Sequence, residues 1–396
     1  MIRPREFPLV LAAAAIVALH LVDVADWLPL AFLALAVAAA RVLRAGPRAL
    51  LLGALAPLAL FGGVLHLLHV RWDGLARTDV TGLALFAAGA LFAVAAVMAA
   101  LDRKRLSPLR RALRVLVTLA LVLLVAVFFV VPVAAAMWLA GKPRQPLTPA
   151  TFPLPHADVG LRAADGTRLA GWWVPSRNGA AVVLVHGGGG DRDGVRRQAL
   201  LLARHGYGVL LYDERGRGES GGTTQSMGWN WVQDVRAAVD YASQRRGVRA
   251  VGALGLSTGA EVVVTAAAHD SRIRGVVAEG LINRDLADSE HQKTSDNVTG
   301  LPYWWVTFQA LRAETGTHPP EPLTDDLRRI APRPVLMIAA AKNPPERTAA
   351  PVYGKAAGPT ASLWLVQAGH TRALETFPRR YERRVVGLFD RALLHR

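Results

Sequence analysis

Val251-Gly-Ala-Leu-Gly-Leu-Ser-Thr-Gly-Ala260 is the most informative segment of the sequence. Its apolar first half predicts a strand, and the run from Ala260 to His269 predicts a helix directly after it. Between them lies a G-x-S-x-G pattern, whose two glycines let strand and helix approach closely around a sharp turn. The turn exposes the Ser257 hydroxyl as a candidate nucleophile, and the amide of Thr258 at the helix start is a candidate donor to an oxyanion.

A serine hydroxyl is a weak nucleophile and needs a neighbouring base. His370 lies in Gln367-Ala-Gly-His-Thr371, directly after the last strand-like run of the chain. A loop histidine at the end of a strand can reach the apex of a neighbouring strand, so His370 is the predicted general base.

A second glycine-rich segment, His186-Gly-Gly-Gly-Gly190, follows the apolar run Ala181–Val185. Glycines allow a backbone to approach a ligand closely, and we expect the amide of Gly188 to be the second oxyanion donor. His186 ends the strand beside this loop, and we interpret it as structural. No Lys-Ser/Thr pair follows the glycines, which disfavours a phosphate-binding loop.

From residue 156 onward, apolar runs alternate with helix-like segments, which predicts a mainly parallel sheet covered by helices on both faces. A hairpin is expected around Asp165-Gly166, and the stretch 281–320 is read as irregular and would suit a lid or cap. The expected strands are Val159–Ala163, Arg168–Val174, Ala181–Val185, Gly208–Tyr212, Arg249–Leu254, Ile273–Ala278, Pro334–Ala340 and Ser362–Val366. The expected helices are Asp193–His205, Trp229–Arg245, Ala260–His269 and Pro378–Leu394.

The N-terminal part of the chain has a membrane-like composition. Of the 396 residues 52% are hydrophobic, and the apolar excess lies before about residue 140. A helix needs about 20 apolar residues to cross a bilayer, and five segments are candidates. They are Phe7–Val22, Trp27–Ala40, Ala49–Val70, Val80–Leu101 and Leu113–Ala140. We expect a helical membrane region over 1–140, a linker over 141–155 and an α/β domain over 156–396.

The charges of the connections predict an orientation. Basic residues gather in the second and fourth connections, whereas the first connection carries only acids. Because positively charged loops stay in the cytoplasm, we expect the N-terminus and these two connections there. Five spans place the α/β domain outside, and four spans place it inside. We expect five, and hence a multi-pass cell-membrane protein with an extracytoplasmic α/β domain.

The bulk charge and the cysteine count exclude some classes of partner. The formal net charge is +16, but the arginines are scattered and no nucleic-acid motif is present, so we expect no nucleic acid. The absence of cysteine excludes disulfides and thiolate metal sites. His66 and His69 lie one helical turn apart without further ligands, and we interpret them as a polar helix end. No cofactor or metal is expected, and the oligomeric state stays open.

The order of these motifs resembles that of the α/β-hydrolase superfamily, in particular its serine esterases, lipases and peptidases. The resemblance covers roughly residues 155–396 and rests on Asp165-Gly166, His186-Gly-Gly188, Asp213-x-Arg-Gly-x-Gly-x-Ser220, Gly255-x-Ser-x-Gly259 and Gly369-His370. It implies an α/β-hydrolase fold with Ser257 as nucleophile and His370 as base. The amides of Thr258 and Gly188 would form the oxyanion hole.

The acid of the triad departs from the family pattern. The family has Asp or Glu just after the strand that corresponds to Pro334–Ala340, and this chain has Asn343 at the aligned position. We predict that Glu346, three residues later, is the acid, because its longer side chain extends its reach. Glu279, at the end of the preceding predicted strand, is the alternative. Under a third interpretation Glu346 merely begins the following helix, where an acid favours the helix dipole.

These residues together predict a membrane-anchored serine hydrolase, carboxylesterase- or lipase-like, that acts on a small-molecule or lipid-like acyl ester. An aminopeptidase-like amidase on the same triad is one alternative, and a catalytically silent membrane-tethered binding domain is another. The segment Leu301-Pro-Tyr-Trp-Trp305 with Phe308 is compatible with an apolar acyl pocket, with contact to the membrane surface, and with ordinary core packing.

Overall fold

The computed structural model describes residues 152–222, 226–284, 286–291 and 295–395, together with helix α6 (Val131–Ala140) and scattered positions from 107 to 128. The chain divides into two units, Met1–Met137 and Trp138–Arg396. The first four predicted membrane segments, part of the fifth, the histidines at 66 and 69 and most of the predicted linker lie outside the described residues. Within the part of the chain that is described, every helix is too short or too polar to cross a bilayer.

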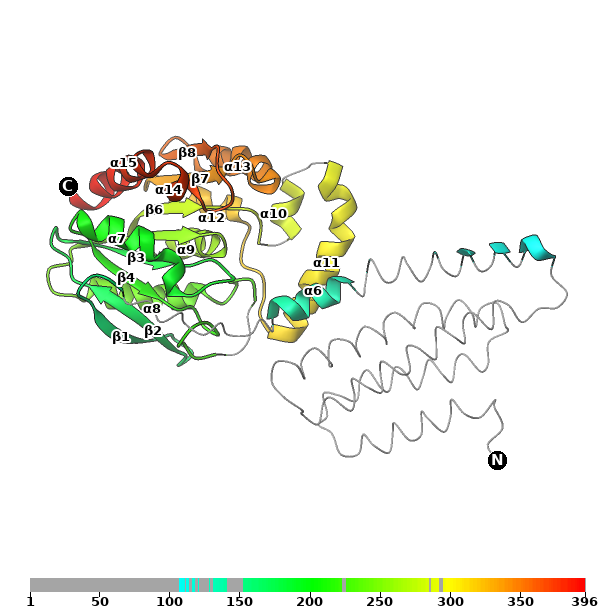
Figure 1. The fold of residues 1–396 in the computed structure, drawn as a ribbon, viewed down its shortest axis with the longest axis horizontal. Coiled ribbons are helices and arrows are strands. Elements are labelled where there is room, and N and C mark those ends of the chain that lie inside the picture. Colours follow the sequence, from blue (N-terminus) through cyan, green and yellow to red (C-terminus); the bar gives the residue numbers. More distant parts are fainter. Residues whose placement is uncertain are drawn as a thin grey trace, which may run out of the picture. The chain divides into compact units, whose positions relative to one another are not determined.

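The second unit is built around an eight-stranded sheet with the order β1-β2-β4-β3-β5-β6-β7-β8 (Figure 1). The strands from β4 to β8 along this order are parallel, and β2 is antiparallel to both β1 and β4. The strands are β1 (Ala157–Arg162), β2 (Arg168–Val174), β3 (Ala180–Val185), β4 (Gly208–Tyr212), β5 (Ala250–Leu256), β6 (Ile273–Glu279), β7 (Val335–Ala340) and β8 (Ala361–Val366). The central strands β3, β4 and β5 are buried along their whole length, which explains their continuous apolar sequence.

Helices cover both faces of the sheet (Figure 1). One core layer packs α8, α9, α12 and α13 against the sheet, and the other packs α7, α15 and η4 against the opposite face. The described helices of this unit are η3 (Arg192–Val195), α7 (Arg196–Arg204), α8 (Val232–Ser243), α9 (Thr258–His269), α10 (Leu286–His291), α11 (Ser295–Thr315), α12 (Leu323–Ile330), α13 (Pro344–Ala357), α14 (Ala373–Thr376), α15 (Pro378–Phe389) and η4 (Asp390–Leu394). The predicted mainly parallel sheet covered on both faces is therefore confirmed.

One local prediction about this unit was wrong. The stretch 281–320 is not irregular, because it contains α10 and the 21-residue helix α11. Helix α11 continues through Gly300 and Pro302, although glycine and proline are the least favourable residues in a helix interior. Whether this pair of helices acts as a cap stays a prediction.

The order of the strands creates a position suited to a site. The chain passes from β3 to its neighbour β4 on one side and then to β5 on the other side of β3. In open α/β sheets, ligands bind at the carboxyl ends of the strands where the order reverses in this way. The carboxyl ends of β3 and β5 carry the segments that begin at His186 and Ser257.

Candidate active site

Ser257 occupies the sharp turn between β5 and α9. Its backbone has φ 54° and ψ −125°, a conformation that a non-glycine residue adopts only under strain. A Cβ atom on Gly255 would lie 2.1 Å from the carbonyl oxygen of Gly259, and one on Gly259 would lie 2.4 Å from that of Val185. Both glycines are therefore required for the strand and the helix to approach each other, as the sequence pattern predicted.

The structure brings Ser257, His370 and Glu346 into one hydrogen-bonded chain. Nε2 of His370 lies 2.8 Å from the Ser257 Oγ, and Nδ1 lies 2.6 Å from the Glu346 Oε1. These three residues come from the ends of β5 and β8 and from the first turn of α13. With Nδ1 protonated, the ring donates to the carboxylate and presents its Nε2 lone pair to the serine hydroxyl.

The position of Glu346 explains why it, and not Asn343, faces His370. Asn343 is the N-cap residue of α13, and its carbonyl oxygen accepts from the amide of Arg347. In the first turn of the helix, the Glu346 side chain is fully buried, and its Oε2 accepts from the amide of Ala340 at 2.7 Å. Glu346 thus lies at a helix start and also beside His370, so the two interpretations of this residue are compatible.

The glycine loop after β3 lies next to the elbow. A Cβ atom on Gly187 would lie 3.3 Å from the Cβ of Ser257, and one on Gly188 would lie 2.8 Å from the Oγ1 of Thr258. Thr258 is the first residue of α9, so its amide has no acceptor within the helix. The amide-bearing backbone at positions 188 and 258 is therefore near Ser257, where an oxyanion would form.

Two buried residues, His186 and Arg217, form hydrogen bonds with this glycine loop. His186 donates from Nδ1 to the carbonyl oxygen of Gly187 at 2.8 Å, and its Nε2 accepts from the amide of Glu214 at 3.1 Å. Complete burial lowers the pKa of His186 to about 4, so the ring is neutral and serves as a structural link between two loops. Arg217 donates to the carbonyl oxygen of Gly188. Sequence reasoning did not single out Arg217, because it belongs to a turn that packs against the loop only in the folded chain.

Glu279, the alternative acid, ends β6 and is 2% exposed. Its Oε1 accepts from the amide of Ala373 at 2.9 Å, while Glu346 occupies the position at the Nδ1 of His370. The structure therefore brings Glu346 and not Glu279 into hydrogen bonding with the predicted base.

The aromatic residues of α11 differ in exposure: Phe308 is buried and Trp305 is exposed. Phe308 is 5% exposed and packs with Trp304 and Trp229, at centroid distances of 5.6 and 5.9 Å. Trp305 is 51% exposed. Phe308 is thus part of ordinary packing, and Trp305 is available for contact with a ligand or a surface.

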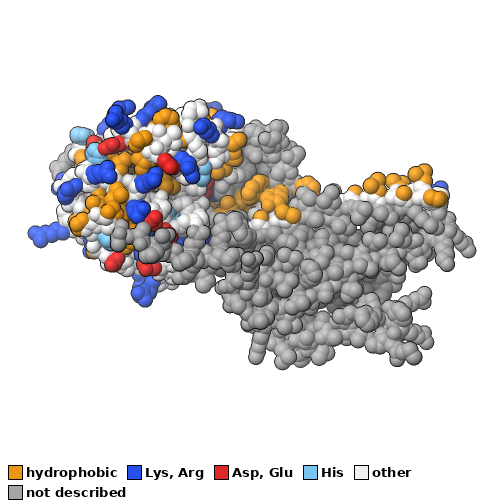
Figure 2. All heavy atoms as spheres, viewed as in Figure 1, with side chains coloured by type: hydrophobic (Ala, Val, Ile, Leu, Met, Phe, Trp, Pro, Cys, Tyr) orange, Lys and Arg blue, Asp and Glu red, His pale blue; other side chains and the backbone are white. Residues whose placement is uncertain are grey.

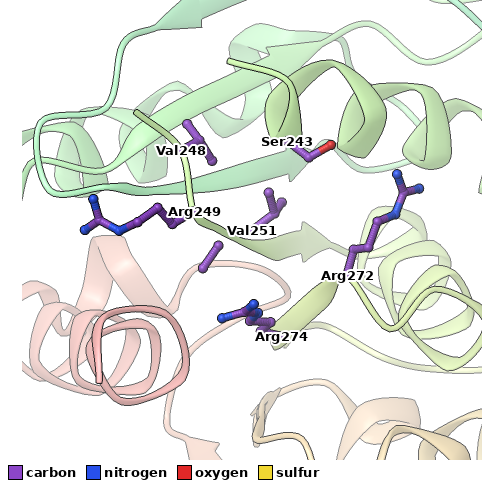
Figure 3. A pocket seen from close by; sticks show the side chains of 7 residues that line it. Ser243, Val248, Arg249, Val251, Arg272 and Arg274 are labelled. Carbon is purple, nitrogen blue, oxygen red and sulfur yellow. The ribbon is translucent and has the colours of Figure 1, made fainter. Parts of the chain in front are cut away.

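Two other features lie away from Ser257. A hollow of about 140 Å³ lies at the amino ends of β5 and β6, and the Arg249 and Arg272 side chains at its rim extend in different directions (Figure 3). A group of potential metal ligands, His269, Glu321 and Asp326, lies at the far end of α9, where Arg329 already contacts Glu321 and His269.

The basic side chains on the visible face of the molecule are interspersed with acidic and apolar ones (Figure 2).

The parallel sheet with a strained serine at its switch point defines the α/β-hydrolase fold. A family model described as serine aminopeptidase, S33, matches residues 176–283, a range that includes Ser257 and ends before Glu346 and His370. The chain is similar in fold to the esterase Pf2001 of Pyrococcus furiosus, with a TM-score of 0.54 and 21% identity over 64% of this chain and 98% of that one.

Similarity to curated sequences is confined to part of the chain. Rv2307c of Mycobacterium tuberculosis is 36% identical over 131 residues, which is 29% of this chain and 45% of that protein. The thiohydrolase aneE of Aspergillus aculeatus is 30% identical over 129 residues, 31% of this chain and 41% of that protein. The chain therefore spans less than half the length of these relatives.

Proposed function

We propose that this protein is a membrane-anchored serine hydrolase that cleaves carboxylic esters through an acyl-enzyme. The hydrogen-bonded chain from Glu346 through His370 to Ser257 carries the proposal, with distances of 2.6 and 2.8 Å at the two ends of the imidazole. The apolar segments before residue 140 support the membrane anchor.

The proposed reaction has two halves. His370 Nε2 takes the hydroxyl proton of Ser257 while Oγ attacks the ester carbonyl carbon, and the amides of Gly188 and Thr258 stabilise the oxyanion. The tetrahedral intermediate then breaks its bond to the leaving oxygen, which takes the proton from His370. Water attacks the acyl-enzyme with His370 again as base, and the carboxylic acid leaves as Ser257 is restored. Glu346 stabilises the imidazolium in both halves.

A serine-directed fluorophosphonate and an activated ester test the proposal together. Ser257→Ala should abolish labelling and lower kcat by at least about 10³-fold, because the oxyanion hole alone leaves only residual catalysis. Ser243→Ala is the matched control, since Ser243 belongs to the end of α8 and should keep both activities. Undiminished turnover by a folded Ser257→Ala protein would contradict the proposal.

The family description favours one second candidate, an aminopeptidase-like amidase on the same residues. An ester and an amide with the same acyl group separate the two, because only the leaving group differs. Asn343 at the position aligned with the family's acid is the reason to consider a catalytically silent domain, and the Glu346 carboxylate 2.6 Å from the Nδ1 of His370 supports the active alternative. Wild-type protein that neither reacts with the label nor releases a burst of product would restore the silent alternative.

A further inference from the structure

Glu279 is a buried carboxylate that the proposed reaction does not use. It ends β6, which lies between β5 and β7 in the sheet, and so between the strands that lead to Ser257 and to Glu346. It is 2% exposed. A buried carboxylate is costly without hydrogen bonds or a charge partner, so its position calls for a role.

Glu279 is bonded to both sides of the candidate active site. Its carbonyl oxygen accepts from the amide of Ser257 at 2.8 Å, and its Oε1 accepts from the amide of Ala373 at 2.9 Å. Ala373 lies three residues after His370 and begins α14. The residue therefore links the nucleophile's backbone to the segment that carries the base.

The backbone after Glu279 lies directly against the imidazole. Gly280 has φ +89°, and a Cβ atom there would lie 2.9 Å from Cε1 of His370. No side chain fits between this turn and the ring. A shift of the backbone at Glu279 therefore moves groups that directly contact the imidazole.

The polar and ionisable groups that face Glu279 come from three other segments. The ionisable ones are His370 and Glu346 on α13, and the neutral hydroxyl of Tyr381 on α15 also faces Glu279, with Gln198 of α7 beyond it. Burial is the main cause that raises the pKa of Glu279 to about 7; Ala373, Tyr381 and His370 favour the ionised form, and Glu346 disfavours it. Glu279 therefore changes charge near neutral pH, beside the imidazole.

We propose that Glu279 is a positioning residue, which anchors the His370 segment through Ala373 and sets the basicity of His370 through its own charge. When Glu279 is ionised, its negative charge adds to that of Glu346 and favours the imidazolium form of His370. When Glu279 is neutral, Glu346 alone supports the ring. This inference concerns the site of the proposed function, but its structural content does not depend on which bond is cleaved.

Two variants separate the charge of Glu279 from its hydrogen bond. Glu279→Gln removes the charge and keeps an acceptor for the Ala373 amide. Ala373→Pro removes the donor and keeps the charge, and proline is tolerated in the first turn of a helix. If Ala373→Pro does not fold, Glu279→Met removes the acceptor at similar volume. Melting temperatures identify any variant that fails to fold.

The pKa of His370 is measured by NMR of the labelled imidazole, assigned with His370→Gln, so this readout needs no turnover. In Glu279→Gln the imidazole should lose its proton at lower pH than in the wild type, and the acid limb of kcat/KM should move to lower pH with it. In Ala373→Pro, kcat should fall about tenfold or more, because a displaced base costs rate. An unchanged His370 pKa in folded Glu279→Gln, or an unchanged kcat when the Ala373 bond is removed, would overturn the inference. An inactive wild type with the expected NMR shift would instead contradict only the proposed function.

Discussion

At the scale of single residues, Glu346 has two partners at once. One carboxylate oxygen lies 2.6 Å from the Nδ1 of His370, and the other accepts from the amide of Ala340 at 2.7 Å. The second bond prevents the carboxylate from rotating, and complete burial keeps water from competing for it. These contacts favour the tautomer with Nδ1 protonated, which is the one that the proposed general base requires.

We predict that Glu346→Gln lowers kcat on a short activated ester by about 10⁴-fold, with little change in stability. Glutamine can retain the bond to the Ala340 amide but cannot stabilise the imidazolium, and such losses in triads have this magnitude. Asn343→Ala is the control, because Asn343 lies outside the hydrogen-bonded chain and should leave kcat within a few fold. A near-normal kcat in Glu346→Gln would mean that Ser257 and His370 act as a dyad.

The sequence predicts a residue's position where neighbouring residues determine it. It does not predict contacts between residues that are far apart in the chain. The glycines at 255 and 259 fix a turn within one segment, so the strained turn at Ser257 could be predicted without a structure. Glu346 could be proposed from its reach, but Glu279 competed with it, because nothing in the sequence shows which carboxylate meets the ring. The Ala373 amide that engages Glu279 is 94 residues away in the chain, which no local pattern reveals.

At the scale of elements, the contact between β3 and α9 limits what the elbow tolerates. Gly259, in the first turn of α9, lies so close to the end of β3 that a methyl group there would meet the carbonyl oxygens of Val185 and His186 at 2.4 and 2.5 Å. Both oxygens belong to backbone, which cannot turn aside as a side chain would. The helix itself must therefore move if residue 259 gains a Cβ atom.

We predict that Gly259→Ala lowers the free energy of unfolding by about 1–3 kcal/mol, as expected for forced overpacking in a tight interface. Because α9 carries Thr258 and follows Ser257, its displacement should also lower kcat. Gly189→Ala is the matched control, since a Cβ atom there has no neighbour within 4 Å among the described residues. Denaturant titration of both variants measures the difference, and equal stabilities would show that the interface relaxes without cost.

The elements were predictable to the extent that their sequence was apolar and bounded by turns. All eight strands correspond to predicted runs within a few residues. The central strands β3, β4 and β5 were the clearest, because buried parallel strands require continuous apolar side chains. Helix α11 was missed, because its apolar residues are not arranged on one face and Gly300 and Pro302 suggest an end. Helix α13 begins with two prolines, which fit its first turn and yet resemble a loop in the sequence.

At the scale of the whole molecule, the sequence combines an α/β-hydrolase unit with an apolar N-terminal region. The hydrolase unit accounts for the residues of the proposed reaction, and the N-terminal region supports the proposal of a membrane anchor. Positively charged loops stay in the cytoplasm, so the basic connections of that region predict on which side of the membrane the hydrolase unit lies. We propose that five spans place the hydrolase unit outside the cytoplasm.

We predict that a cysteine at an exposed position of the hydrolase unit reacts with an impermeant maleimide in intact cells, and that one in the fourth connection does not. The chain has no native cysteine, so Arg246→Cys and Ser107→Cys each report without background. Both positions are exposed, and a difference in labelling therefore reflects the membrane and not burial. Permeabilised cells are the control, because both cysteines should react there. Labelling of Ser107→Cys alone in intact cells would place the hydrolase unit in the cytoplasm and favour four spans, since an even number returns the chain to the side on which it began.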